Sequence, residues 1–359
     1  MPADTPLISI LIPIFNAEEF LVECLDSVVN QKLTDFEAIC INDGSTDSSR
    51  EIIEQYLQAD SRFRVIDKPN SGYGASLNRG LNEARGKYIA ILESDDFYDL
   101  QILQKLYNSI TQFDAQVAKA NCYLYWSGPP KKNTFNHLVP RKQYAKLINP
   151  QVNHEIFYLQ PSVWSALYSR DFLNDNDVRF LETPGASYQD TGFAFKVWFS
   201  ATKVVYLPEA LLHYRQDNMG SSINSPGKVY CVVDEHSEMD RYISSRPIPD
   251  WLPGVKTKMK YDTYLWNYER LAEEFKLEFL QHMAKELAEA EQLGQLDWSL
   301  FKEWQHADLQ TILTSCEEYH RQRQMSDNRS KAGKAMHYLR VGGPMLLFKI
   351  LLDKFFPAY

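Results

Sequence analysis

The stretch YIAILESDDFYD, residues 88–99, decides the fold, because an apolar run ends abruptly in the acids Glu93, Asp95 and Asp96. A short apolar run of this kind is typical of a buried strand. Residues two apart in an extended chain share a face, so Glu93 and Asp95 should point the same way and Asp96 the other way. Two carboxylates on one face repel unless a cation lies between them, and oxygen ligands without thiols suit Mg²⁺ or Mn²⁺. The alternative is that Asp95 and Asp96 cap the next helix.

Similar apolar runs recur upstream, and helical patterns separate them. The alternation of helices with fully apolar strands indicates a parallel sheet that is covered by helices on both faces. In such sheets ligands bind beyond the carboxyl ends of the strands. The expected strands are 7–13, 36–41, 62–66 and 87–92, and the expected helices include one that follows Asn16, one at 50–57 and one at 74–86.

The pattern changes after about residue 115 and becomes mostly helical after about residue 228. We therefore expect an α/β domain over residues 1–225 and a helical region over residues 226–359. The segments expected in this part are strands at 115–126, 161–168 and 210–216, helices at 190–201 and 264–294, and a proline-bearing linker at 234–254.

Composition restricts the function. The chain has 359 residues and a net charge of -9, which disfavours nucleic acid as a partner because phosphate binding needs clustered Lys and Arg. The five scattered cysteines form no CxxC pair and indicate reduced thiols of a cytoplasmic protein. The first residues lack the basic start of a signal peptide, and no apolar run is long enough to span a bilayer.

Two further loops are expected at the same edge of the sheet. In NDGSTD, Asp43 directly follows the second strand and could accept hydrogen bonds from a base or ribose, or it could simply be a satisfied turn residue. In NSGYGASLNRG, Gly72 and Gly74 let the backbone approach a ligand closely, and Arg79 could face phosphate. This loop is not a Rossmann fingerprint, because it follows the third strand and has Leu77 where the third glycine belongs.

The segments PIFNAEEFLVECLDSVVNQ, NDGSTDSS, NSGYGASLNRGLNEARGKYIAILESDD and YQDTGF occur in this order. Together they resemble a family 2 glycosyltransferase with the GT-A fold, over roughly residues 6–225. The resemblance implies a nucleotide-sugar donor, commonly a UDP-sugar, a divalent metal (Mn²⁺ or Mg²⁺), and inversion at the anomeric carbon. It divides the α/β domain into a nucleotide-binding half, residues 1–97, and an acceptor half, residues 98–225.

The resemblance also implies roles for single residues of the donor site. Asp43 matches the aspartate that contacts uracil and ribose, and the Pro13–Asn16 loop matches the segment along the base. Glu93-Ser94-Asp95 matches the DXD motif, in which Asp95 is the metal and diphosphate residue; the first position is usually Asp and here is Glu93. The nucleotide-sugar residues expected on this basis are Pro13, Phe15, Asn16, Asp43, Asn70, Gly72, Arg79, Glu93, Ser94 and Asp95.

In YQDTGF, Asp190 matches the family's general base, which takes the proton of the acceptor hydroxyl. It could also cap the helix at 190–201. In HYRQDNMGSS, His213 and Asp217 could reach the metal from a mobile loop, although a lone histidine at a strand end is more often structural. Trp164 and Tyr188 are the aromatic residues assigned to the acceptor.

The C-terminal residues 344–356 form a dense apolar run after several Lys and Arg residues. Such a segment fits a helix lying in a membrane interface, which would make the protein peripheral on the inner face of the plasma membrane. The alternatives are a helix docked on the catalytic domain or on a second subunit of a homodimer.

The sequence thus predicts an inverting, metal-dependent hexosyl- or N-acetylhexosaminyltransferase that acts on a glycan or lipid-linked acceptor in surface-polysaccharide synthesis. A sugar-1-phosphate nucleotidyltransferase is one alternative, but it should carry a glycine-rich basic loop directly after strand one, and PIFNAEE has neither feature. A non-catalytic sugar-binding protein on the same fold is the other.

Overall fold

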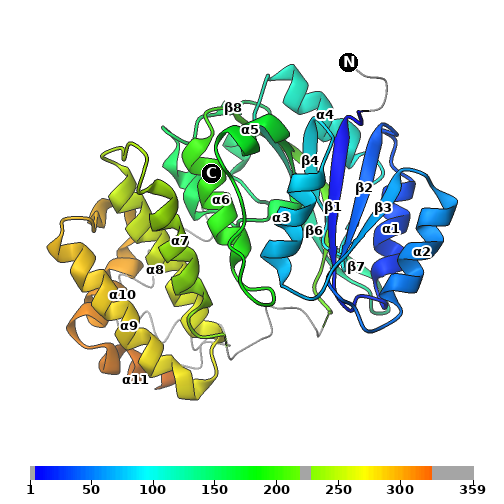
Figure 1. Cartoon of the computed structure of the whole chain (residues 1–359). Helices are drawn as coiled ribbons and strands as arrows, with labels where there is room; N and C mark the ends of the chain where they lie inside the picture. The colour runs from blue at the N-terminus through cyan, green and yellow to red at the C-terminus, as the bar shows by residue number, and fades with distance from the viewer. Residues whose placement is uncertain (1–4, 219–227, 326–359) are drawn as a thin grey trace. The chain divides into compact units, whose positions relative to one another are not determined.

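Buried parallel strands form the centre of the first of two units into which the chain divides, Met1–Ile223 and Asn224–Tyr359 (Figure 1). The structure is a computed structural model that describes residues 5–218 and 228–325. The central strand β1 lies between β2 and β4, with Ile8 opposite both Phe36 and Tyr88. The four strands predicted from the apolar runs are confirmed as β1 (Ile8–Ile14), β2 (Phe36–Asn42), β3 (Phe63–Asp67) and β4 (Tyr88–Ile91).

The order of these strands explains why helices cover both faces of the sheet. Helices α1 (Leu21–Val29) and α2 (Ser49–Ala59) carry the chain outward from β1 to β2 and β3, whereas α3 (Tyr73–Glu83) returns it to β4 on the other side of β1. Such crossovers are almost always right-handed, so the return crossover places α3 on the opposite face. The direction of winding reverses between β1 and β4, and the carboxyl ends of these strands are where open sheets bind ligands.

The second half of the sheet is mixed. Strand β4 pairs antiparallel with β9 (Ala166–Ser169), which pairs antiparallel with β6 (Val117–Trp126), and β6 pairs parallel with β10 (Val204–Arg215). Every pairing among β1–β4 is parallel, whereas the second half combines parallel and antiparallel pairings. The remaining elements of this unit are β5 (Phe97–Tyr98), α4 (Ile102–Gln112), β7 (Lys132–Asn136), β8 (Leu147–Ile148), α5 (Arg170–Asp175), α6 (Gln189–Ser200), and three short 3₁₀ helices at Arg141–Gln143, His154–Tyr158 and Val163–Ser165.

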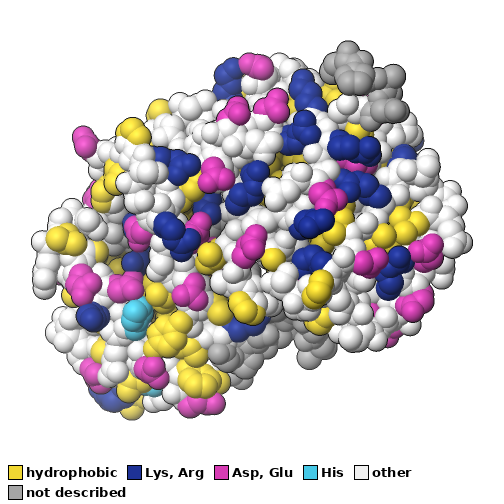
Figure 2. All heavy atoms as spheres, in the orientation of Figure 1, with side chains coloured by type: hydrophobic (Ala, Val, Ile, Leu, Met, Phe, Trp, Pro, Cys, Tyr) yellow, Lys and Arg dark blue, Asp and Glu magenta, His cyan; other side chains and the backbone are white. Residues whose placement is uncertain are grey.

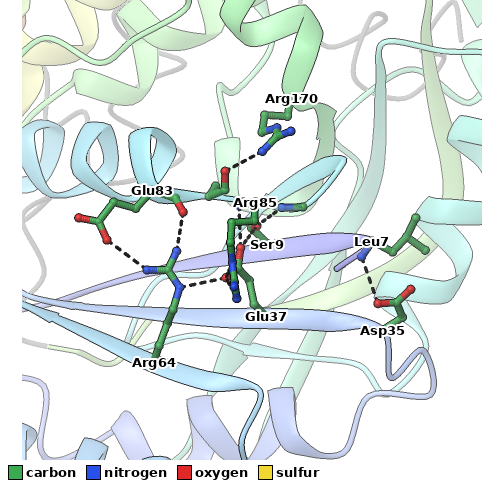
Figure 3. A network of polar contacts seen from close by, with 10 residues as sticks. Leu7, Ser9, Asp35, Glu37, Arg64, Glu83, Arg85 and Arg170 are labelled. Carbon is green, nitrogen blue, oxygen red and sulfur yellow. Dashed lines mark hydrogen bonds and ion pairs between the residues drawn. The ribbon is translucent and has the colours of Figure 1, made fainter. Parts of the chain in front are cut away.

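At the amino-terminal edge of the sheet, Glu37 joins neighbouring strands through hydrogen bonds and ion pairs (Figure 3). The buried Glu37 accepts hydrogen bonds from the hydroxyl of Ser9 at 2.6 Å, from Arg64 Nε at 2.9 Å, and from the backbone and guanidinium of Arg85. Burial would raise the pKa of Glu37, but these hydrogen bonds outweigh burial and lower it. This carboxylate is satisfied in its charged form, as expected of a structural residue.

The second unit is helical in its described part, and its elements correct two expectations. The helix expected over 264–294 is interrupted at Leu271 and Ala272, which are extended. Neither Leu nor Ala breaks helices, so tertiary packing explains the interruption. The break lets α8 and α9 pack side by side, and it buries the side chain of Leu271. The linker expected at 234–254 is narrower, because its first half is helical. The helices are α7 (Cys231–Ile243), α8 (Leu252–Arg270), α9 (Glu273–Gln292), α10 (Glu303–Thr314) and α11 (Cys316–Met325).

No helix within residues 5–218 and 228–325 combines the length and apolar character needed to cross a bilayer. The interfacial helix expected at 344–356 lies outside the described residues, as do residues 219–222 at the end of HYRQDNMGSS.

Candidate active site at the carboxyl edge of the sheet

Four carboxylates from two distant parts of the chain lie at the carboxyl end of β4. Glu93, Asp95 and Asp96 follow the strand, and Asp190 is in the first turn of α6. Their charges, together with burial, raise the pKa of the nearby Tyr214 hydroxyl. Unlike the paired Glu37 at the other edge, this cluster concentrates negative charge, which is typical of a functional site.

Glu93, in the same cluster, has a strongly perturbed carboxyl group. Its Oε1 accepts a hydrogen bond from the Tyr73 hydroxyl at 2.5 Å. Burial and the charges of Asp95 and Asp190 raise the pKa of Glu93 to about 8, although the Tyr73 bond acts in the opposite direction. The side chain expected at the first position of a DXD motif thus reaches Tyr73 at the start of α3.

Asp95 and Asp96 point to different surroundings, but residues 93–96 form a turn, closed by the Asp96 N–H and the Glu93 carbonyl at 3.1 Å, and not the extended chain assumed from the sequence. Asp95 Oδ2 accepts a hydrogen bond from the side chain of Asn218 at 2.8 Å. Asp96 is buried, and its Oδ1 accepts the backbone N–H of Arg215 at 2.8 Å. Burial and the charge of Asp95 raise the pKa of Asp96 well above its ordinary value, although the backbone bond from Arg215 acts in the opposite direction.

Arg215 connects the acidic loop to the end of β10. Its Nε donates to the carbonyl oxygen of Asp95 at 2.7 Å, and its guanidinium pairs with Glu23 and lies 4.6 Å from the centre of the Phe20 ring. The side chain of Arg215 is buried, so it fixes the position of Asp95 rather than facing a phosphate. Sequence reasoning did not identify this role, because it depends on contacts across more than a hundred residues.

The segment that carries Asp190 packs tightly on the start of α3. A Cβ added to Gly74 would lie 2.1 Å from the carbonyl oxygen of Leu181, and one added to Gly72, whose φ is +95°, would lie 2.3 Å from that of Thr183. The N–H of Tyr73 donates to the carbonyl of Gly185 at 2.9 Å. The close approach that Gly72 and Gly74 permit is therefore made by residues 181–185 of the chain itself and not by a ligand. This packing holds the segment before Asp190 against the start of α3.

Backbone strain marks the same region. Asn16 and Tyr188 have φ values of +50° and +60°, in the left-handed region that non-glycine residues rarely adopt. Such strain costs on the order of 1 kcal/mol or more and clusters at functional sites. Tyr188 immediately precedes α6, so the strain lies beside Asp190.

The loops after β1 and β2 are joined to each other. Asn16 Oδ1 accepts the N–H of Thr46 at 2.8 Å, and its own N–H donates to Ser45 Oγ at 3.1 Å. Asp43 is buried; it accepts the N–H groups of Ser71 and Gly72 at 2.9 and 3.0 Å and pairs with Lys68. These contacts are those expected if Asp43 is a hydrogen-bonded turn residue, which was the alternative to a role in binding a base or ribose. The loop that Asp43 holds leads directly into α3.

The other expected donor residues are dispersed around this edge. Pro13 is buried within β1, Phe15 is 50% exposed beside it, and Asn70 is exposed. Ser94 lies between Glu93 and Asp95. Arg79 is exposed and pairs with Glu83 one turn further along α3, so no observed contact directs it to the acidic cluster.

The structure does not bring His213 and Asp217 together with Asp95 in one metal-holding group. The ring of His213 stacks between Phe97 at 4.3 Å and Tyr123 at 5.2 Å, on the opposite face of β10 from Tyr214. Asp217 accepts hydrogen bonds from the backbone and hydroxyl of Ser127 at 2.6 and 2.7 Å. Within the described residues no group of three His, Cys, Asp or Glu side chains could hold a metal ion.

Trp164, expected to contact the acceptor, and the buried Lys119 belong to the part of the chain that forms the second half of the sheet. Trp164 is buried and stacks on Tyr214 at 4.9 Å, so it supports Tyr214 rather than presenting an open platform. Lys119 is buried and donates to the carbonyls of Pro161 and Ser162 at 3.2 and 2.6 Å. Burial lowers the pKa of Lys119 to about 7, and the negative charge of Asp190 acts against this shift. In the sequence, the buried position of Lys119 is indicated only by its place as a single lysine within an apolar strand.

We expect the raised pKa of Glu93 to make stability pH-dependent. The folded chain keeps this proton up to about pH 8, whereas the ordinary pKa is 4.5, so stability should fall as pH rises through that window. Glu93→Gln has no proton to lose and can still accept from Tyr73. Its melting temperature should therefore exceed that of the wild type by a margin that widens from about pH 5 to about pH 9. Differential scanning calorimetry without donor or metal, with exposed Glu155→Gln as the control, checks this; parallel curves would contradict it.

The chain is similar in sequence to known glycosyltransferases. The model of the family "Glycosyl transferase family 2" matches residues 9–174. The chain is 33% identical over 242 residues to the uncharacterized glycosyltransferase EpsJ of Bacillus subtilis, covering 64% of this chain and 66% of EpsJ. It is 30% identical over 220 residues to glycosyltransferase GlyG of Streptococcus pneumoniae, covering 58% of this chain and 71% of GlyG. For three curated relatives, EpsJ among them, the aligned region spans only 35% to 66% of their own length.

Among solved structures, residues 1–349 of S. aureus TarS in complex with UDP-GlcNAc match with a TM-score of 0.68 and 19% identity, covering 90% of this chain and 91% of that chain. This likeness concerns the fold, and it confirms the GT-A fold expected from the sequence. The likeness to GlyG, of which the chain covers more than two thirds, and the family match over residues 9–174 agree on the family. The chain therefore belongs to glycosyl transferase family 2.

Proposed function

We propose that this chain transfers a glycosyl group from a UDP-sugar to a hydroxyl group of a glycan or lipid-linked acceptor, with inversion at the anomeric carbon. The observation that carries the proposal is the acidic cluster, in which the charges of Asp95 and Asp190, from segments almost a hundred residues apart, both act on Glu93. A metal and diphosphate site at Asp95 and a base at Asp190 are the two parts that an inverting transfer needs.

The donor lies, in this proposal, along the loops after β1 and β2. Asp43 is already engaged by Ser71, Gly72 and Lys68, so it supports the nucleotide by fixing the turn and through a carboxylate lone pair that remains available. Phe15, half exposed beside Asn16, supplies an apolar surface for a base. The match to TarS bound to UDP-GlcNAc makes UDP-GlcNAc the first donor to test.

A divalent metal fits this site when the donor completes it. Mg²⁺ commonly binds to one or two carboxylates and to substrate phosphates rather than to an all-protein cage, and Asp95 is the carboxylate that would hold Mg²⁺ or Mn²⁺ here. The crowding of like charges that raises the pKa of Glu93 favours an added positive charge. When bound, the metal stabilises the negative charge that develops on the departing diphosphate.

Asp190 is the proposed general base. It lies in the first turn of α6, where the helix dipole favours a charged carboxylate. In an inverting transfer the acceptor hydroxyl attacks from the side opposite to the leaving diphosphate, and a carboxylate must take its proton. Lys119 holds the Ser162 turn below Trp164, and Trp164 backs Tyr214, so these residues keep the acceptor side rigid.

The acceptor and the location of the protein are part of the same proposal. Surface-polysaccharide synthesis on lipid-linked precursors requires a cytoplasmic enzyme at the inner face of the plasma membrane, and the apolar residues 344–356 supply one possible contact. Family membership does not favour a nucleotidyltransferase. A non-catalytic sugar-binding protein would bind a donor without releasing nucleotide, so turnover separates it from an enzyme.

A panel of nucleotide-sugars tests the proposed donor class. We expect UDP-sugars, UDP-GlcNAc first, to raise the melting temperature of the full chain only in the presence of Mn²⁺ or Mg²⁺, because binding to the folded state alone stabilises it. GDP-sugars under the same conditions serve as the matched control. Equal shifts with and without metal, or no shift with any UDP-sugar, would contradict the proposal.

A further inference from the structure

One stretch of this acidic chain contains only positive formal charges. Residues 115–154 include Lys119, Lys131, Lys132, Arg141, Lys142 and Lys146 and no Asp or Glu, in a chain whose net charge is -9. Lys119 is buried, and the other five are exposed. On the face of the molecule drawn in Figure 2, by contrast, basic and acidic side chains are interspersed over the region of α3 and β1–β3. The stretch ends at Glu155, whose carboxylate lies 3.9 Å from Lys142 Nζ.

The basic stretch runs along the sheet, from the end of β6, where Lys132 lies opposite Trp126 and packs on its ring, to the start of β10, where Leu147 lies opposite Val205. Strand β7 pairs antiparallel with β6, and the chain then crosses β6 and β10 to reach β8, which pairs with the start of β10. In this crossing segment the hydroxyl of Tyr144 donates to the side chain of Asn121 at 3.2 Å, and Tyr144 also contacts His137 at 2.7 Å. Arg141, Lys142 and Lys146 lie on the exposed side of the segment.

Large apolar side chains are exposed in the same stretch. Phe135 is 38% exposed, Leu147 is 46% exposed, and Val152 is 72% exposed. Phe135 packs against Tyr123 and His137, at ring distances of 5.8 and 4.5 Å, so it is held in place by its neighbours. Basic side chains beside exposed apolar ones are the composition that binds the interface of an anionic membrane.

We propose that residues 131–152, here called the basic strip, are a docking surface for an anionic lipid bilayer. The proposal rests on the proposed function, since a lipid-linked acceptor must be presented at such a surface, and it adds a membrane contact on the catalytic unit itself. The occupant is a bilayer rather than a polyanionic glycan, because the aliphatic side chains of Leu147 and Val152 gain by leaving water and offer nothing to a polar polymer.

The basic strip is also connected to the acidic cluster. Ser127, in the turn between β6 and β7, donates two hydrogen bonds to Asp217, and the adjacent Asn218 donates to Asp95. One end of the hairpin therefore contacts the segment that holds the proposed metal residue. Docking through the strip would place its Lys131 end beside the catalytic edge, while Lys146 and Leu147 meet the bilayer near the start of β10.

Flotation of the full-length protein with vesicles tests this surface. We expect binding to phosphatidylglycerol-containing vesicles and not to pure phosphatidylcholine, with loss of binding when salt is raised to about 0.5 M because exposed charges are then screened. The triple variant Lys131→Gln, Lys142→Gln and Lys146→Gln should lower the partition coefficient on the order of a hundredfold, at roughly fivefold for each cation near an anionic surface.

The matched control is Lys32→Gln, Lys87→Gln and Lys285→Gln, which removes the same charge from exposed positions outside the strip and should bind as the wild type does. Leu147→Ser with Val152→Ser should also weaken binding, whereas Ile248→Ser with Leu293→Ser, equally exposed in the second unit, should not. Equal loss in strip and control variants, no loss in either, or binding to soluble anionic polymers in place of vesicles would overturn the proposal. Metal-dependent UDP-sugar binding, measured on the same variants, should be unchanged; its absence in the wild type would count against the proposed function instead.

Discussion

Asp190→Asn is expected to lower the rate of glycosyl transfer by about 10²–10⁴-fold, because an amide cannot accept the proton of the acceptor hydroxyl. Asn has nearly the same shape, so the packing of the 181–190 segment on α3 should persist. Donor affinity should therefore remain close to that of the wild type. The measurement is nucleotide release at saturating donor, together with calorimetric titration of donor in the presence of metal.

The matched control for this prediction is Asp171→Asn. Asp171 also occupies the first turn of a helix, α5, and it is exposed away from the acidic cluster. It should leave both rate and affinity unchanged. Near-normal turnover of Asp190→Asn would remove Asp190 from the mechanism, and loss of donor affinity with it would show that Asp190 holds the donor instead.

Asp95→Ala should abolish the metal-dependent part of donor binding. Removal of residues that only orient a metal ligand typically costs 10–100-fold in affinity, so removal of the ligand itself should cost at least about 10²-fold. Titration of a UDP-sugar with and without Mn²⁺ measures this, and Glu93→Gln, which keeps Asp95, should be milder. If Asp95→Ala binds the donor as tightly as the wild type with metal present, the metal site lies elsewhere.

Local patterns predicted the first half of the fold well. The apolar runs that became β1–β4 carry their own signal, and the intervening helices have amphipathic patterns, so neither depends on distant contacts. The single helix expected at 264–294 was wrong for the opposite reason. Nothing in its composition marks Leu271, and only packing between α8 and α9 explains the break there.

The same distinction applies to the candidate site. Asp95 and Asp96 do face different surroundings, but a turn separates them rather than the strand alternation that was assumed, and alternation could not tell which face of β10 His213 would occupy. The hydrogen bonds from Tyr73 to Glu93 and from Arg215 to Asp95 link segments 20 and 120 residues apart, and no spacing in the sequence encodes them. These contacts, rather than the motif alone, define the surroundings of the acids.

The central claim is that the acidic cluster catalyses inverting transfer from a UDP-sugar, and the stereochemistry of slow donor hydrolysis tests it without knowledge of the acceptor. Proton NMR of full-length protein with UDP-GlcNAc and Mn²⁺, recorded in the first minutes before mutarotation, identifies the anomer that is released. The account predicts that the β-anomer appears first from this α-linked donor and that Asp190→Asn suppresses its formation. First release of the α-anomer, or hydrolysis that is unaffected by Asp190→Asn, would contradict it.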